Sequence, residues 1–234
     1  MPDREPVFNL PPAIVALGGI MVAVHVLRMA VGADLDFRLI VEFAFVPARY
    51  VAPAAWPGGV GALFWTPITY AFLHGDFVHL AVNLFWMAGF GTPAARRLGT
   101  RRFLLLSALS SAAGALAHYV VFPSEAVPMI GASAAVSGMT AATARFAFVE
   151  GGPLGGGSRA AAYFVPAPPI RRLLANGRTA FFVLMWFGVN LLFGVQGSLI
   201  PGVEGAIAWQ AHIGGFLAGL VLFPLLDPVA RAER

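Results

Sequence analysis

Residues 207–226, with the sequence IAWQAHIGGFLAGLVLFPLL, form an apolar run that contains no arginine, lysine, aspartate or glutamate. A run of about 20 such residues is long enough for an α-helix to cross the hydrocarbon core of a bilayer. The whole chain has the same character, because 59% of its 234 residues are hydrophobic and only 11% are charged, whereas soluble domains carry about 25% charged residues. The sequence therefore predicts an all-α membrane protein embedded in a lipid bilayer.

Five further apolar runs of similar length precede this one, which predicts a bundle of six transmembrane helices. We expect them at residues 13–31, 76–92, 103–122, 129–149, 179–199 and 207–226. The runs follow one another closely, so residues 1–234 are expected to form a single membrane domain. Residues 32–75 are rich in Phe, Trp, Pro and Gly, and we expect a large first loop that lies partly in the membrane. Residues 150–178 contain GGPLGGGSR and PAPPIRRL, which predict a solvated loop.

The basic residues, all of them arginines, are distributed unevenly between the predicted spans. Arginines follow the second, fourth and sixth spans, whereas the loops after the third and fifth spans contain none. Because arginine in short loops favours the cytoplasmic side, both termini are expected in the cytoplasm. The second, fourth and sixth spans then begin at the outer face. This arrangement suits membrane orientation better than phosphate binding, so no nucleic-acid partner is expected.

Ser133 is the candidate nucleophile, because Pro128 and Gly131 before it indicate that a helix begins close to it. The N–H groups in the first turn of a helix have no intrahelical acceptor and lie at the positive end of the helix dipole. The Ser133 N–H is therefore a candidate donor to a developing oxyanion. The alternative is a small-residue packing face, common where membrane helices meet closely, formed by Gly131, Ser133, Ala134, Ser137 and Gly138.

His212 is the candidate general base. Gly215 and Gly219 lie three and seven residues after it and share its helix face, where glycine lets a neighbouring backbone approach closely. Packing of this face on the small residues of the fourth span would bring His212 and Ser133 to the same depth. The alternative is a structural histidine whose ring has a hydrogen-bond partner elsewhere.

His79 and Asn83 are four residues apart and lie on one face of the second span. Both side chains can donate hydrogen bonds. Together with the Ser133 N–H they could surround an oxyanion with donors that are in place before the substrate binds. The alternative is a polar clamp between helices.

The sequence excludes several other kinds of hydrolytic site. The absence of cysteine excludes a thiol nucleophile and disulfides. No HExxH motif and no close cluster of histidines and carboxylates is present, so no metal is expected. The last four spans contain no carboxylate, and Asp227 lies about 22 Å beyond His212 along a helix, so we expect a dyad without a third member. We expect structural roles for His25, Arg28, His118 and Arg145, the last reaching the cytoplasmic surface.

Three motifs in these spans resemble those of the rhomboid intramembrane serine proteases. They are HGDFVHLAVN at residues 74–83, GASAAVSG at residues 131–138 and AHIGGFLAG at residues 211–219, and they occur in the family's order. The chain is similar to bacterial six-span rhomboids over most of its length.

The resemblance implies an enzyme that cleaves peptide bonds within or next to the transmembrane helices of single-span substrate proteins. Ser133 would be the nucleophile and His212 the base, with His79, Asn83 and the Ser133 amide as the oxyanion hole. The resemblance also implies a water-filled cavity that opens to the outer face, a mobile fifth span as a lateral gate, and a location in the bacterial cytoplasmic membrane. No cofactor is implied.

Three positions depart from the family's pattern. Ala134 follows the serine where glycine is usual, and Trp65-Thr66 stands where Trp-Arg is common. Ser137 stands where some members have an aromatic ring that packs on the histidine. An alternative function is therefore a catalytically inactive rhomboid-like protein that binds membrane clients. A proton-coupled transporter using the buried histidines is a third hypothesis, but it predicts two repeated halves, and the sequence has no such repeat.

Overall fold

The computed structural model describes residues 9–157, 160–196 and 208–229, which contain helices and helical turns but no strand. Phe45 and Met129 form an isolated antiparallel bridge. The α-helices are α1 (Pro12–Ala30), α2 (Ala33–Phe43), α3 (Pro47–Val51), α4 (Ala62–Thr69), α5 (Phe77–Trp86), α6 (Thr92–Val121), α7 (Ser133–Ala144), α8 (Gly177–Gln196) and α9 (Trp209–Leu226). Shorter 3-10 turns are η1 (Pro53–Ala55), η2 (Gly59–Gly61), η3 (Tyr70–Phe72), η5 (Ala160–Phe164) and η6 (Ile170–Ala175), and η4 (Met87–Gly91) is a π-helical turn.

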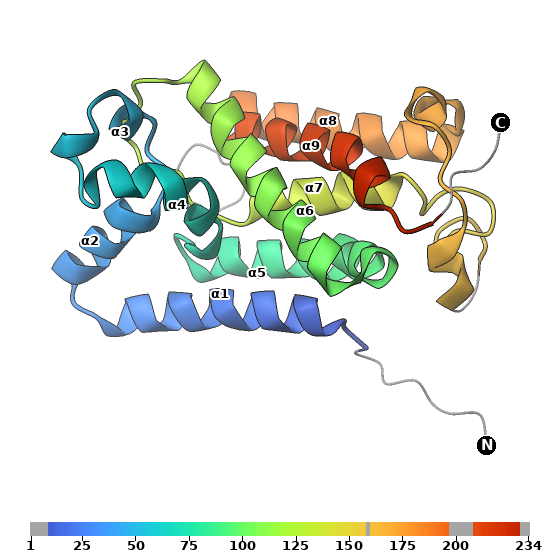
Figure 1. The fold of residues 1–234 in the computed structure, drawn as a ribbon, viewed down its shortest axis with the longest axis horizontal. Coiled ribbons are helices and arrows are strands. Elements are labelled where there is room, and N and C mark those ends of the chain that lie inside the picture. Colours follow the sequence, from blue (N-terminus) through green and yellow to red (C-terminus); the bar gives the residue numbers. More distant parts are fainter. Residues whose placement is uncertain (1–8, 158–159, 197–207, 230–234) are drawn as a thin grey trace.

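Helices overlap the predicted spans in chain order, but Phe77–Val121 forms one continuous helical run across the second and third of them. Within the described residues, the helical runs long and apolar enough to cross a membrane are Pro12–Ala30, Phe77–Val121 and Trp209–Leu226. The apolar part of α8, Gly177–Leu192, is shorter. Residues 197–199 of the fifth predicted span and Ile207 of the sixth lie outside the described residues. The prediction of an all-α membrane protein is confirmed, and Figure 1 shows α6 crossing obliquely over α7 and α9.

The fourth predicted span, residues 129–149, is wrong at both ends. Helix α7 has 12 residues, so it is about 18 Å long and too short to cross a bilayer. It begins late because Met129 is paired with Phe45, and Gly131 has a φ of +115°. Eleven of its residues are buried, so α7 is an internal helix that lies between α5 and the pair α8 and α9 (Figure 1).

The connection between the second and third spans is also more ordered than expected. Residues 93–102, predicted to be an arginine-rich loop, belong to α6 and are interrupted by Gly99, which has a φ of 74°. At the start of this helix Arg97 is fully buried and forms a bidentate ion pair with Asp227, with N···O distances of 2.9 and 2.8 Å. The Arg97 side chain also donates to the carbonyls of Tyr163 and Val165. The arginine therefore joins α6, the end of α9 and the connection before α8.

The connection at residues 150–178 is only partly the solvated loop that the sequence predicts. Its side chains Ala162, Ala167 and Leu173 are buried. Arg145, expected at the membrane surface, is buried beneath this connection and donates to the Pro168 carbonyl at 2.7 Å. Backbone carbonyls of a covering segment can hydrogen-bond a guanidinium, so it need not reach the solvent.

The first loop, residues 32–75, folds into short helices and turns around a buried arginine. Figure 1 shows α2, α3 and α4 together at one end of the bundle. The Arg49 guanidinium donates to the carbonyls of Val41 and Ala44 at the end of α2, where helical carbonyls have no intrahelical donor. Thr66 donates back to Ala62 O at 2.7 Å. Thr66 stands where arginine is common after the tryptophan. In this chain the hydrogen bonds of an arginine within the first loop come from Arg49.

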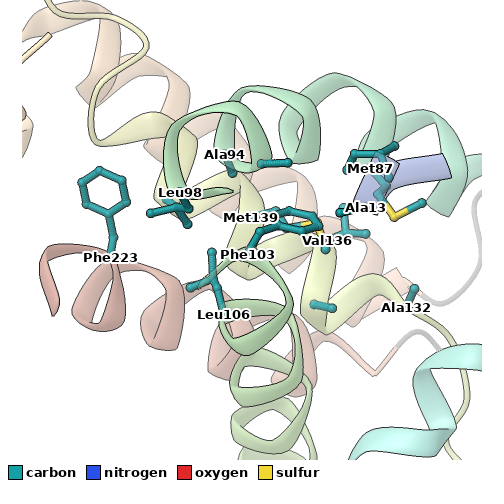
Figure 2. Packing of buried hydrophobic residues seen from close by; sticks show 14 of the residues in the cluster. Ala13, Met87, Ala94, Leu98, Phe103, Leu106, Ala132, Val136, Met139 and Phe223 are labelled. Atoms are coloured by element: carbon teal, nitrogen blue, oxygen red, sulfur yellow. The ribbon is translucent and has the colours of Figure 1, made fainter. Parts of the chain in front are cut away.

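Small residues allow α6, α7 and α9 to pack with their backbones close together. A Cβ atom on Gly215 would lie 2.1 Å from the Ala134 carbonyl oxygen, and one on Gly219 would lie 2.2 Å from that of Gly138. Beside this contact, a hydrophobic core joins α1, α5, α6, α7 and α9. Figure 2 shows Phe103 and Met139 within it. The result is a tightly packed centre that positions the first turns of α7 and α9.

Candidate active site

The N-termini of α5, α7 and α9 lie at the same end of the bundle (Figure 1). Ser133 is the first residue of α7, and His212 lies in the first turn of α9. His212 Nε2 is 2.7 Å from Ser133 Oγ. Residues 79 positions apart in the chain thus form a hydrogen bond between the two side chains that a serine hydrolase requires.

The backbone N–H of Ser133 lies at the N-terminus of α7. The helix begins after Ala132, and its first backbone bond runs from Val136 N to Ala132 O at 2.9 Å. The Ser133 N–H therefore precedes the intrahelical hydrogen bonds of α7 and lies at the positive end of the helix dipole. This arrangement favours negative charge beside the serine.

His79 and Asn83 lie beside the segment that leads into Ser133. Asp76 caps α5 by accepting a hydrogen bond from His79 N at 2.8 Å, which fixes the turn that carries His79. A Cβ atom on Gly131 would lie 2.6 Å from His79 Nε2 and 3.8 Å from Asn83 Nδ2. Asn83 Nδ2 donates to His79 O at 3.1 Å, and a primary amide has a second N–H to offer. Two side-chain nitrogens thus approach the backbone just ahead of the serine.

A third residue contacts His212, although the sequence led us to expect none. Asn190 Oδ1 of α8 is 2.6 Å from His212 Nδ1. An amide oxygen takes the place that a carboxylate has in a Ser-His-Asp triad. The available signal is that Asn190 is the one side-chain amide, and that no hydroxyl or charged side chain occurs, between Thr179 and Gln196; polar side chains in membrane helices tend to face partners or cavities.

A family model, the Rhomboid domain, matches residues 62–227 of the 234-residue chain. The chain belongs to the rhomboid family. No curated protein matches the sequence. The matched region of this rhomboid begins at α4 and ends at Asp227, and it therefore includes Ser133, His212, His79 and Asn83.

The structure shows the contacts of two residues that depart from the rhomboid pattern, Ala134 and Ser137. Ala134 is buried, and its methyl group faces Gly114 of α6, where a Cβ atom would lie 2.5 Å from the Ala134 Cβ. The extra methyl is thus accommodated by a glycine on the neighbouring helix. Ser137 Oγ donates back to Ser133 O at 2.7 Å. In this rhomboid the histidine ring is instead held from α8.

The other polar residues of the spans have contacts consistent with structural roles. Arg28 pairs with Asp36 at 2.7 Å and donates to His74 O, and His118 Nε2 lies 3.1 Å from Glu125. These partners lie in the connections between spans, where spacing within a span could not indicate them. His74 precedes α5 and packs edge-on against His79, with ring centroids 5.1 Å apart. Burial, followed by the neighbouring His79, lowers the pKa of His74 to about 3, so its ring is neutral.

No group of three or more histidine and carboxylate side chains suited to a metal ion occurs among the described residues. The arrangement brings a serine hydroxyl, an imidazole ring and hydrogen-bond donors together. These groups come from α5, α7 and α9, with a further polar contact from α8.

Proposed function

We propose that this rhomboid is an intramembrane serine protease that cleaves peptide bonds within or next to the transmembrane helices of single-span substrate proteins. The observation that carries the proposal is the 2.7 Å contact between His212 Nε2 and Ser133 Oγ. A serine hydroxyl is a weak nucleophile until a base accepts its proton. The residues near the N-termini of α5, α7 and α9 can supply both the base and the oxyanion donors.

In the first step Ser133 Oγ attacks the scissile carbonyl carbon while His212 Nε2 accepts the hydroxyl proton. The carbonyl oxygen becomes an oxyanion, and the Ser133 N–H and the side-chain N–H groups of His79 and Asn83 are the proposed donors to it. When the intermediate collapses, the C–N bond breaks and the His212 imidazolium protonates the leaving amine. Water then attacks the acyl-enzyme with His212 as base, releasing the carboxylate product and restoring the Ser133 hydroxyl.

Gly131, Gly215 and Gly219 are proposed as supporting residues. A side chain at Gly131 would occupy space that His79 needs, and side chains at Gly215 and Gly219 would separate α9 from α7. Separation by even about 1 Å is costly, because catalytic groups must be held within about 0.5 Å of their productive geometry.

The protein is an integral membrane protein, and we propose a bacterial cytoplasmic membrane with both termini in the cytoplasm. The arginine clusters after the second, fourth and sixth spans support this orientation. The end of the bundle that carries Ser133 and His212 would then open to the outer face. The partners would be the bilayer and single-span substrates.

Labelling with a fluorescent fluorophosphonate tests the proposal, because the probe reacts with activated serines. The native protein in detergent should be labelled, and Ser133→Ala and His212→Ala should not. Ser107→Ala is the matched control, since Ser107 is a buried serine whose hydroxyl donates along its own helix α6, to Phe103 O. Cleavage of a reconstituted single-span substrate should follow the same pattern. A folded native protein without labelling or cleavage would support the alternative, a client-binding protein without activity.

A further inference from the structure

We propose that Asn190 of α8 is a positioning residue that fixes the tautomer and the ring orientation of His212. The inference rests on the proposed function, because it assigns to His212 the role of base. The site would then be a triad of Ser133, His212 and Asn190, in which an amide oxygen takes the place that a carboxylate has in a Ser-His-Asp triad.

The hydrogen bonds around Asn190 determine which of its amide atoms faces the histidine. Asn190 Nδ2 is 2.8 Å from Trp186 O, which can only accept a hydrogen bond. The amide nitrogen must therefore point along α8, and Oδ1 must point at His212 Nδ1, 2.6 Å away. The reversed amide would bring two oxygens together at Trp186 and lose a hydrogen bond.

The same network determines the protonation of the ring. Because Asn190 Oδ1 is an acceptor, His212 Nδ1 must carry the proton, and Nε2 then has a lone pair directed at the Ser133 hydroxyl. This is the tautomer that a general base needs. Without Asn190, a neutral imidazole can place its proton on Nε2, where it cannot accept the serine proton.

The packing between α8 and α9 keeps Asn190 in register with His212. Trp186 lies one turn before Asn190, and Phe216 lies one turn after His212. Their rings stack with centroids 4.2 Å apart and an interplanar angle of 25°. Phe187 packs on the same Phe216 ring at 5.3 Å. The hydrogen bond and the stacked rings are therefore two neighbouring contacts between α8 and α9.

This placement makes the base depend on the position of α8. Ser133 and His212 belong to α7 and α9, whereas Asn190 belongs to a third helix. A displacement of α8 that lengthens the 2.6 Å contact would release the His212 ring while the backbones of α7 and α9 stay packed. Reactivity of the serine would then change without any change in the residues of the dyad.

Two measurements on the full chain in bicelles test the proposal. The first is ¹⁵N NMR of histidine-labelled protein, with His212→Ala used to identify the His212 ring signals. The native protein should show a protonated Nδ1 and a lone pair on Nε2, and Asn190→Leu should show a mixture of tautomers. This readout does not require proteolysis.

The second measurement is cleavage of a single-span substrate as a function of pH. Asn190→Leu keeps the approximate volume but removes the acceptor, and it should lower kcat by about 10-fold to 100-fold, a part of the 10²–10⁴ that general base catalysis contributes. KM should change little, because Asn190 contacts the base. Asn190→Asp restores an acceptor and adds a charge that stabilises the imidazolium. It should therefore recover most of kcat and move the rising limb of the pH profile to higher pH than in Asn190→Leu.

Val189→Ala is the control for a local change in α8, because Val189 is the preceding residue and its side chain is 44% exposed. It should leave the tautomer, kcat and the pH profile unchanged. Among the described residues, the titratable group that acts electrostatically on His212 is His79 of α5, so His79→Gln should be measured alongside to separate its titration from that of His212.

The outcomes separate this inference from the proposed function. If native protein cleaves substrate and Asn190→Leu has the native tautomer, kcat and pH profile, the positioning role is wrong and the protease proposal stands. If native protein neither cleaves substrate nor reacts with fluorophosphonate, the protease proposal fails, whatever the tautomer. A native His212 with its proton on Nε2 also overturns the inference.

Discussion

The Ala134 methyl group of α7 points at Gly114 of α6, and a Cβ atom on that glycine would lie 2.5 Å from it. The same Cβ would lie 2.8 Å from Ala211 O and 3.2 Å from the Tyr70 hydroxyl. Gly114 thus leaves the space that Ala134 fills, directly beside the nucleophile. The pair explains how the chain tolerates a methyl group at the position after Ser133.

Gly114→Ala should therefore destabilise the protein by about 1–3 kcal/mol, the usual cost of overpacking a core. Ala134→Gly in the same chain should recover part of this loss, because it removes one of the contacts that the new methyl makes. Thermal unfolding of the four proteins of the double-mutant cycle in detergent measures the coupling. Purely additive effects would contradict a direct contact between these two positions.

Gly131→Ala should abolish most of the activity with a smaller effect on stability. The residue has a φ of +115°, which side chains rarely adopt, and the new Cβ would lie 2.6 Å from His79 Nε2. Displacement of one oxyanion donor costs about 10²–10³ in kcat. The substrate-cleavage assay measures the effect.

Gly75→Ala is the control for Gly131→Ala, because a Cβ on Gly75 would meet its nearest neighbour, Ile130, at 3.9 Å. It should retain activity within a few fold of native. Equal activity of Gly131→Ala and Gly75→Ala would show that the position of His79 does not matter for catalysis.

Asp227→Asn should destabilise the fold without changing the chemistry at Ser133. The Arg97–Asp227 pair is buried, and removing one charge of a buried pair costs about 3–5 kcal/mol because the other charge is left without its partner. The unfolding temperature should fall. Fluorophosphonate labelling measured well below that temperature should persist, since Asp227 lies at the end of α9 opposite His212.

The control for Asp227→Asn is a change to an exposed charge nearby. Arg101 on α6 is exposed, and Arg101→Ala should change the free energy of unfolding by less than about 1 kcal/mol. If Asp227→Asn is no more damaging than Arg101→Ala, the buried ion pair does not stabilise this end of the bundle.

His74 should make the protein less stable as the pH falls below about 6.5. Its pKa is about 3 in the folded protein and about 6.5 in the unfolded chain. Between these values the unfolded chain binds more protons, so lowering the pH favours unfolding by up to about 1.4 kcal/mol per pH unit. His74→Phe keeps an aromatic ring but removes the titration. Its unfolding free energy should fall less steeply than that of native protein between pH 6.5 and 5, and parallel curves would refute the assignment.

Local patterns in the sequence were enough to predict the class of the protein and the residues to inspect. Repeated apolar runs of about 20 residues with few charges indicate a membrane protein. The i, i+4 spacing of His79 and Asn83, and of His212 with its glycines, depends only on helix geometry. Ser133 lies close to a helix start that Pro128 and Gly131 indicate in the sequence. The structure then brings these residues together at one end of the bundle.

Relationships between helices could be found only in the tertiary structure. Helix α7 is far shorter than its apolar run suggests, because Phe146 and Ala147 beyond its end are buried inside the bundle rather than in contact with lipid. Arg97 and Asp227 lie 130 residues apart, and Asn190 reaches His212 from a different helix. Hydropathy and periodicity in a sequence predict which residues share a face of one helix. Which side chains meet across an interface depends on where the helices cross, and that is set by the packing of the whole bundle.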